Sequence, residues 1–266
     1  MAVLSVDLAF RRWSDLGVVV LSHAPSRLSI SAVTCEILPF DPPGLDAAGD
    51  CGPVDPENLA GRLNHLCAVR GIRVLMLDGP QAWKSEASGL DHARVSERQL
   101  NTTAKTGLPG RVKPSTCRNF AEFCMDVYDG LCRRGWRRLE TRPQPASPDP
   151  GVAQQERVLV ESSPHAAWRS LGLQPLPAKR RTRVSDLAEA FAALRAVVPL
   201  TVNRPPNHDQ LQAIVGGLPG LALEEHDPGA LRIVGHPPRR EQGHWREGFI
   251  VLPLPPQPAT GVRWLH

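Results

Sequence analysis

Long apolar runs and aromatic residues are both scarce in this sequence. No run approaches the roughly 20 apolar residues that a membrane-spanning helix requires, so we expect no membrane partner. Aromatic residues make up 5% of the chain, and we expect Trp83, Trp136 and Trp168 to be exposed. So few aromatic side chains do not indicate a stacking platform for single-stranded bases.

Paired cysteines and a targeting signal are also missing. The six cysteines include no C-x-x-C pair, which argues against the common zinc sites. We therefore expect reduced, mostly buried thiols. The first ten residues, MAVLSVDLAF, enter a predicted strand at once and lack the basic and apolar regions of a secretory signal. A cytoplasmic location is the resulting expectation.

Proline is abundant, whereas charge is nearly balanced. The 27 prolines are about a tenth of the 266 residues, which predicts stiff loops between regular elements. The net charge is +4 and the calculated pI is 8.9. This mild excess is compatible with an anionic partner such as nucleic acid and does not require one. The length fits a single domain over 1–266 with insertions and leaves the oligomeric state open.

The pattern of apolar residues predicts an α/β fold with a mixed sheet flanked by helices. Apolar runs at 3–6, 17–21 and 28–37, separated by turn residues, predict an antiparallel meander. Nearly continuous apolar runs at 72–78 and 157–160 are typical of strands covered on both faces. A final strand is predicted within 246–253. Caps and apolar spacing predict helices at 56–70, 120–131, 187–198 and 209–215.

Two segments interrupt this pattern. The first, at about 84–114, is polar and rich in Arg, Ser, Thr and Gly. We predict that it is an insertion over the sheet edge, either mobile or ordered by a ligand. The second, at about 142–150, is rich in proline and predicts a loop.

Four acidic residues stand where elements end or begin. Asp7, Asp78 and Glu161 each follow a predicted strand, and Asp209 opens a predicted helix. Ligand sites in open sheets gather at the carboxyl ends of strands. The predicted topology makes the strands of Asp7 and Asp78 neighbours, so we expect these acids to meet.

Clustered carboxylates require a proton or a cation. Two of them about 4 Å apart repel by roughly 4 kcal/mol at an effective dielectric near 20. Oxygen ligands favour Mg²⁺ or Mn²⁺, and two such ions side by side can activate water and stabilise the leaving oxygen in phosphodiester hydrolysis. Asp7, Asp78, Glu161 and Asp209 are therefore the candidate catalytic and metal-binding residues.

Each acid also has a purely structural interpretation. Asp78 precedes Gly-Pro and can cap a turn, while Asp209 lies in a first helical turn, where an acid is favoured anyway. Asp7 and Glu161 follow apolar strands, where an unpartnered acid is costly to bury.

Short motifs along nearly the whole chain resemble domain-of-unknown-function family 429, a family grouped with ribonuclease-H-like nucleases. The matching pieces are Val6-Asp7, Leu77 to Pro80, Arg94 with Glu97-Arg98, Thr106 to Pro109, Glu161 to Ala166, Lys179, Asn207 to Asp209 and Glu247 to Pro253. The resemblance implies a ribonuclease-H-like fold, and it implies that the four acids hold metal. Family members often carry a second acid three residues after the helix-start Asp, where this chain has Gln212.

Three classes of function follow. The first is a metal-dependent nuclease acting on nucleic-acid phosphodiester bonds. The second is a binding or scaffold protein that kept the fold and lost turnover, since the amide of Gln212 cannot supply an acid's charge. The third is a small-molecule phosphate enzyme, but the glycine-rich phosphate loop expected for that class is missing.

Overall fold

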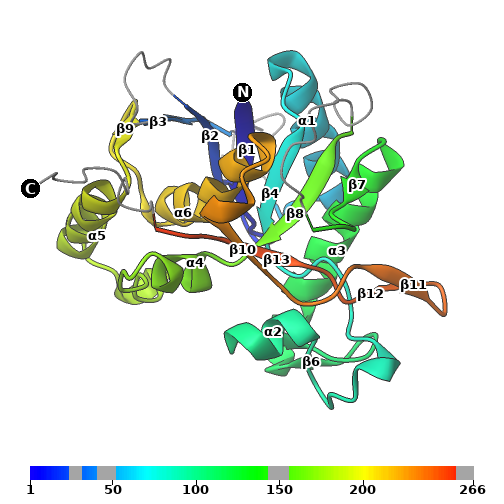
Figure 1. Ribbon diagram of the computed structural model, residues 1–266. Helices are drawn as coiled ribbons and strands as arrows, with labels where there is room; N and C mark the ends of the chain where they lie inside the picture. Colours follow the sequence, from blue (N-terminus) through cyan, green and yellow to red (C-terminus); the bar gives the residue numbers. More distant parts are fainter. Residues whose placement is uncertain (24–31, 41–51, 143–155, 256–266) are drawn as a thin grey trace, which may run out of the picture.

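The computed structural model in Figure 1 describes residues 1–23, 32–40, 52–142 and 156–255. Its main sheet contains nine strands in the order β10-β13-β8-β4-β1-β2-β3-β9, with β7 also paired to β8. These strands are β1 Ala2–Asp7, β2 Gly17–His23, β3 Val33–Ile37, β4 Val74–Asp78, β7 Arg137–Arg138, β8 Val158–Ser162, β9 Leu200–Val202, β10 Leu231–Val234 and β13 Ile250–Pro253. Two separate hairpins pair β5 Lys105–Thr106 with β6 Val112–Lys113, and β11 Arg239–Glu241 with β12 His244–Arg246.

The five central strands form a mixed sheet of antiparallel and parallel strands, as predicted. β1, β2 and β3 make the antiparallel meander. β4 lies parallel to β1 on its other side, and β8 lies parallel to β4. Beyond this core, β9 extends the sheet next to β3, and β13 with β10 extends it next to β8.

Helices cover both faces of this sheet (Figure 1). The helices are α1 Pro56–Arg70, α2 Val95–Leu100, α3 Arg118–Arg133, α4 Pro164–Ser170, α5 Val184–Val197 and α6 His208–Glu224. The predicted start of α1 is confirmed, because Asp55 caps it and Pro56 is its first residue. Asn207 caps α6 in the same way.

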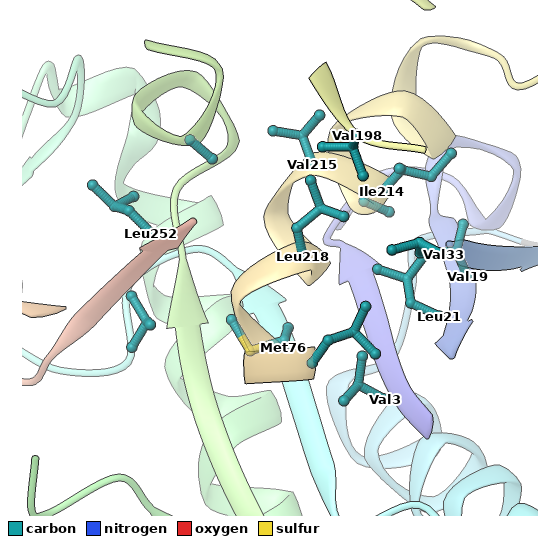
Figure 2. Packing of buried hydrophobic residues seen from close by; sticks show 14 of the residues in the cluster. Val3, Val19, Leu21, Val33, Met76, Val198, Ile214, Val215, Leu218 and Leu252 are labelled. Carbon is teal, nitrogen blue, oxygen red and sulfur yellow. The ribbon is translucent and has the colours of Figure 1, made fainter. Parts of the chain in front are cut away.

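Alternation along the central strands separates two hydrophobic clusters. Leu4 and Val6 of β1 pack with α1 and α3, whereas Val3 packs with α6. Figure 2 shows the α6 face, where Met76 lies with Val3 below Leu218. Because side chains of a strand alternate between faces, the face of every strand-end residue follows from these assignments.

Glycines allow α6 to lie unusually close to the sheet. A Cβ on Gly217 would lie 2.6 Å from the Cβ of Ser5, and one on Gly17 would lie 2.2 Å from the backbone oxygen of Asp209. Ser5 also donates a hydrogen bond of 2.7 Å to the carbonyl of Ala213. The close approach at Gly17 brings the first turn of α6 against the beginning of β2, next to the end of β1.

The segment at 84–114 is ordered differently from our expectation of a mobile insertion. It contains a short 3-10 helix at Glu86–Ser88, then α2 and the β5–β6 hairpin. Arg94, Glu97 and Thr106 are all buried there. Its polar composition is therefore explained by an internal polar network. Residues 143–150 of the predicted proline-rich loop lie outside the described residues.

Two other expectations, on the tryptophans and the cysteines, can be compared with the structure. The exposed placement of Trp83, Trp136 and Trp168 was wrong, since their exposed fractions are 8%, 2% and 0%. Each fills a core position that apolar spacing alone did not reveal. Every cysteine in the described part of the chain is a free thiol. No helix of that part is long and apolar enough to cross a membrane.

Substituting Gly17 with alanine tests the close approach of α6. The added methyl group would overlap the backbone of Asp209, which cannot move away as a flexible side chain would. We expect Gly17→Ala to lower the free energy of unfolding by about 1–3 kcal/mol, measured by urea denaturation. Gly61→Ala is the control, because its methyl group meets only the Arg134 guanidinium at 3.5 Å. Unchanged stability of Gly17→Ala would contradict the packing described.

Candidate metal site

Asp7 and Asp78 lie side by side at the carboxyl ends of β1 and β4. They are direct partners in the parallel register, and alternation turns both side chains to the α6 face. Both residues keep intermediate solvent exposure. The predicted meeting of these two acids therefore occurs in the structure, in a position open to a ligand.

The two carboxyl groups share a proton through a side-chain hydrogen bond. Burial raises the pKa of Asp7 well above its ordinary value of 3.8, and the charges of Asp78 and Asp209 raise it further. Burial also raises the pKa of Asp78, to about 7, although the hydrogen bond from Asp7 offsets part of that shift. Asp7 is thus the proton donor of the pair, since two adjacent carboxylates cannot both ionise cheaply.

Asp209 faces the same pair from the first turn of α6. Its charge raises the pKa of Asp7, so the two groups are within electrostatic reach. Lys179 forms an ion pair with Asp209 and a second one, of 2.7 Å, with Asp15. His208 Nδ1 lies 3.3 Å from the other Asp209 oxygen. These contacts fix the Asp209 carboxylate at the edge of the site and partly neutralise it.

Glu161 is oriented differently from the other three acids. Its register partner in β4 is Leu77, and Ser162 is the partner of Asp78. A shift of one residue reverses the face of the sheet, so Ser162 shares the side of the acid pair and Glu161 turns toward α3. The register between β4 and β8, which the sequence alone did not define, decides this orientation.

Arg94 neutralises Glu161 in a buried network. The guanidinium donates hydrogen bonds of 2.7 and 2.5 Å to the two oxygens of Glu161. It also donates to Glu97 at 3.0 Å and to Thr106 at 3.0 Å. Burial raises the pKa of Glu161, and Arg94 opposes that rise. Metal binding by Glu161 therefore stays a prediction, and in this structure Glu161 is paired with the Arg94 guanidinium.

Gln212 explains the missing second acid on α6. Its side-chain oxygen accepts a hydrogen bond of 2.8 Å from the indole nitrogen of Trp168. The amide thus links α4 to α6.

A pocket of about 240 Å³ adjoins these residues. Asp78, Gln212 and His165 line one side, and the segment at 84–114 contributes Thr102 to Ala104 on the other. The buried network of Arg94 forms part of its wall. The segment at 84–114, which we predicted to be mobile or ordered by a ligand, thus forms part of the wall of this pocket.

No group of three or more His, Cys, Asp or Glu side chains within the described residues is arranged to hold a metal ion. Asp7 and Asp78 nevertheless fit a divalent cation, because two carboxyl groups at one register position supply the oxygen ligands that such ions prefer. Asp209 can contribute once Lys179 releases it. The arrangement therefore offers a two-carboxylate core rather than the four-acid cluster expected.

Comparisons with known proteins add similarity of shape only. No protein-family model matches the chain, and no curated protein is similar to it in sequence. A structure of Thermus thermophilus RuvC aligns with a TM-score of 0.38 and 9% identity over 85% of this chain and 96% of RuvC. A structure of T. thermophilus RuvC in complex with a Holliday junction substrate aligns with a TM-score of 0.39 and 9% identity, over 85% of this chain and 98% of that RuvC chain. We base nothing on scores this low, and the resemblance to family 429 stays a prediction.

Removing one acid of the pair should stabilise the protein at high pH. An acid whose folded pKa is raised binds its proton more tightly when folded, so wild-type stability falls as pH rises from about 4 through 7. We expect Asp7→Asn to raise the free energy of unfolding at pH 8 in EDTA, by up to about 4 kcal/mol, with little effect at pH 4. Denaturation of both proteins at the two pH values measures this. If the free energy of unfolding of Asp7→Asn depended on pH as that of the wild type does, the shared proton would be refuted. Asp55→Asn, which is remote from the site, is the control.

Removing Arg94 should have the opposite effect. Breaking a buried ion pair from one side leaves uncompensated charge and costs about 3–5 kcal/mol. We therefore expect Arg94→Met to lose about that much stability in urea denaturation. The matched control is Arg70→Met, whose pair with Glu36 has side chains 34% and 44% exposed and should contribute about 0–1 kcal/mol. Similar losses for both variants would show that the Arg94 network is not a buried anchor.

Proposed function

We propose that this chain is a nuclease that hydrolyses nucleic-acid phosphodiester bonds with Mg²⁺ or Mn²⁺ bound at Asp7 and Asp78. The observation that carries the proposal is the in-register pair of carboxyl groups, which share a proton at the ends of two central strands. A buried acid pair of this kind costs stability, and a bound cation relieves that cost. The family resemblance and the mildly positive charge support a nucleic-acid substrate.

Each residue then has a defined part in the reaction. A divalent cation would supply Lewis acidity and charge neutralisation at the scissile phosphate. Asp7, once deprotonated, and Asp78 would supply the two carboxylate ligands that hold this cation. Lys179 neutralises Asp209 beside the pair. The adjoining pocket of about 240 Å³ offers room for part of the substrate beside Asp78.

A binding protein without turnover is the second candidate. Two of the four predicted acids are held in ion pairs, Glu161 by Arg94 and Asp209 by Lys179. Gln212 is engaged with Trp168. A protein with this site could recognise nucleic acid through the same pocket and leave the phosphodiester intact.

A cleavage assay distinguishes the two candidates. Purified protein is incubated with branched, duplex and single-stranded DNA and with RNA, in Mg²⁺, Mn²⁺ or EDTA. We expect metal-dependent cleavage that Asp78→Asn reduces at least roughly a hundredfold, since losing a ligand costs several kcal/mol of transition-state stabilisation.

The control for this assay is Asp55→Asn, which makes the same chemical change at the cap of α1 and should retain full activity. Cleavage that persists in Asp78→Asn would assign the activity to a contaminant or another site. Metal-independent binding without cleavage would favour the second candidate.

A further inference from the structure

Both oxygens of Glu161 are occupied by hydrogen bonds, although Glu161 lines the same pocket as Asp78 and its charge raises the pKa of Asp78. One oxygen accepts from Arg94 at 2.5 Å, and the other accepts from Arg94 at 2.7 Å and from the backbone nitrogen of Gln81 at 3.1 Å. The residue is 3% exposed. No oxygen of Glu161 is left for a metal ion unless this set of contacts is broken.

Arg94 is equally committed. Its guanidinium is 1% exposed and sits between Glu161 and Glu97, with Thr106 as a further acceptor. Glu97 in turn accepts from the backbone nitrogens of Arg94 and Thr106, at 3.1 and 2.8 Å. Withdrawal of Arg94 would leave two buried glutamates without a cation, which is strongly unfavourable.

A third buried glutamate, Glu247, holds the same segment. Glu247 accepts from the backbone nitrogens of Ser85 and Val95, at 2.9 and 2.8 Å. Gln81 adds a hydrogen bond of 3.0 Å to the carbonyl of Phe249, just before β13. The segment that carries Arg94 is thus anchored at Ser85 and at Val95, the first residue of α2, which fixes the backbone next to Arg94.

We propose that Arg94 occupies the place of a second cation, so that the site binds a single divalent ion at Asp7 and Asp78. The inference rests on the proposed metal site, and it replaces the two-ion arrangement expected from sequence. Glu161 is then a positioning residue that fixes Arg94 and the pocket wall. It is not a metal ligand.

Titration with Mn²⁺ in the absence of substrate tests this inference. Calorimetry and electron paramagnetic resonance should report one ion per chain with the six-line spectrum of an isolated Mn²⁺. Glu161→Gln should lower Tm and change the Kd for Mn²⁺ less than threefold, and Glu247→Gln should behave alike. Asp78→Asn should weaken binding more than tenfold. Two spin-coupled ions per chain, or a tenfold loss of affinity in Glu161→Gln, would overturn the proposal.

A charge-removal variant tests whether the guanidinium stands in for a cation. Arg94→Ser leaves Glu97 and Glu161 together with free space, so a folded variant should bind a second Mn²⁺ that raises its Tm more than it raises that of the wild type. A folded Arg94→Ser protein that binds no second ion would contradict the proposal. If Arg94→Ser does not fold, the Kd of Glu161→Gln for Mn²⁺ decides whether the proposal holds.

The nuclease proposal can fail separately from this inference. One tightly bound Mn²⁺ together with no cleavage of any substrate contradicts the nuclease and supports the single-ion site. Cleavage with two coupled ions supports the nuclease and contradicts the single-ion site. The absence of any Mn²⁺ binding by the wild type overturns both.

Discussion

The repulsion between Asp7 and Asp78 is the constraint from which the functional account follows. Parallel pairing of β1 with β4 places the two residues in the same register position, and neighbouring strands lie only about 4.8 Å apart. The pair therefore has to hold a proton or a cation. The pair is not needed for stability, because an amide in place of either acid would remove the repulsion between the two carboxylates. Its presence therefore points to a function.

The rest of the structure fixes this pair between two rigid neighbours. On one side, glycines of β2 and α6 bring Asp209 within electrostatic reach of Asp7. On the other side, the network around Arg94 neutralises Glu161 and completes the pocket wall. The two sides are positioned by different interactions. Close backbone packing positions Asp209, whereas buried ion pairs position the network around Arg94. Together they leave the acid pair as the one strongly coupled carboxyl pair near the pocket among the described residues.

Much of the fold could be predicted from sequence, because its signals were local. The meander, the capped helix after Asp55 and the buried strand ending at Asp78 each had a recognisable pattern. The site was only partly predictable. That Asp7 meets Asp78 followed from strand order, but the face of Glu161 depended on a register that the apolar run from Val158 to Val160 did not define. The partners of Glu161 and Asp209 come from residues far away in the chain, Arg94 and Lys179, and no local pattern indicates such pairs.

The most direct measurement is the number of protons released when Mn²⁺ binds, obtained by calorimetry at pH 6 in buffers of different ionisation enthalpy. Metal ligands must lose their protons on binding, and the pair at Asp7 and Asp78 is protonated at that pH. The account predicts release of about one proton or more per bound ion, which declines as the pH is raised and is abolished together with binding in Asp78→Asn. Binding of Mn²⁺ without proton release at pH 6 would show that the ion does not enter this pair, and the central claim would be wrong.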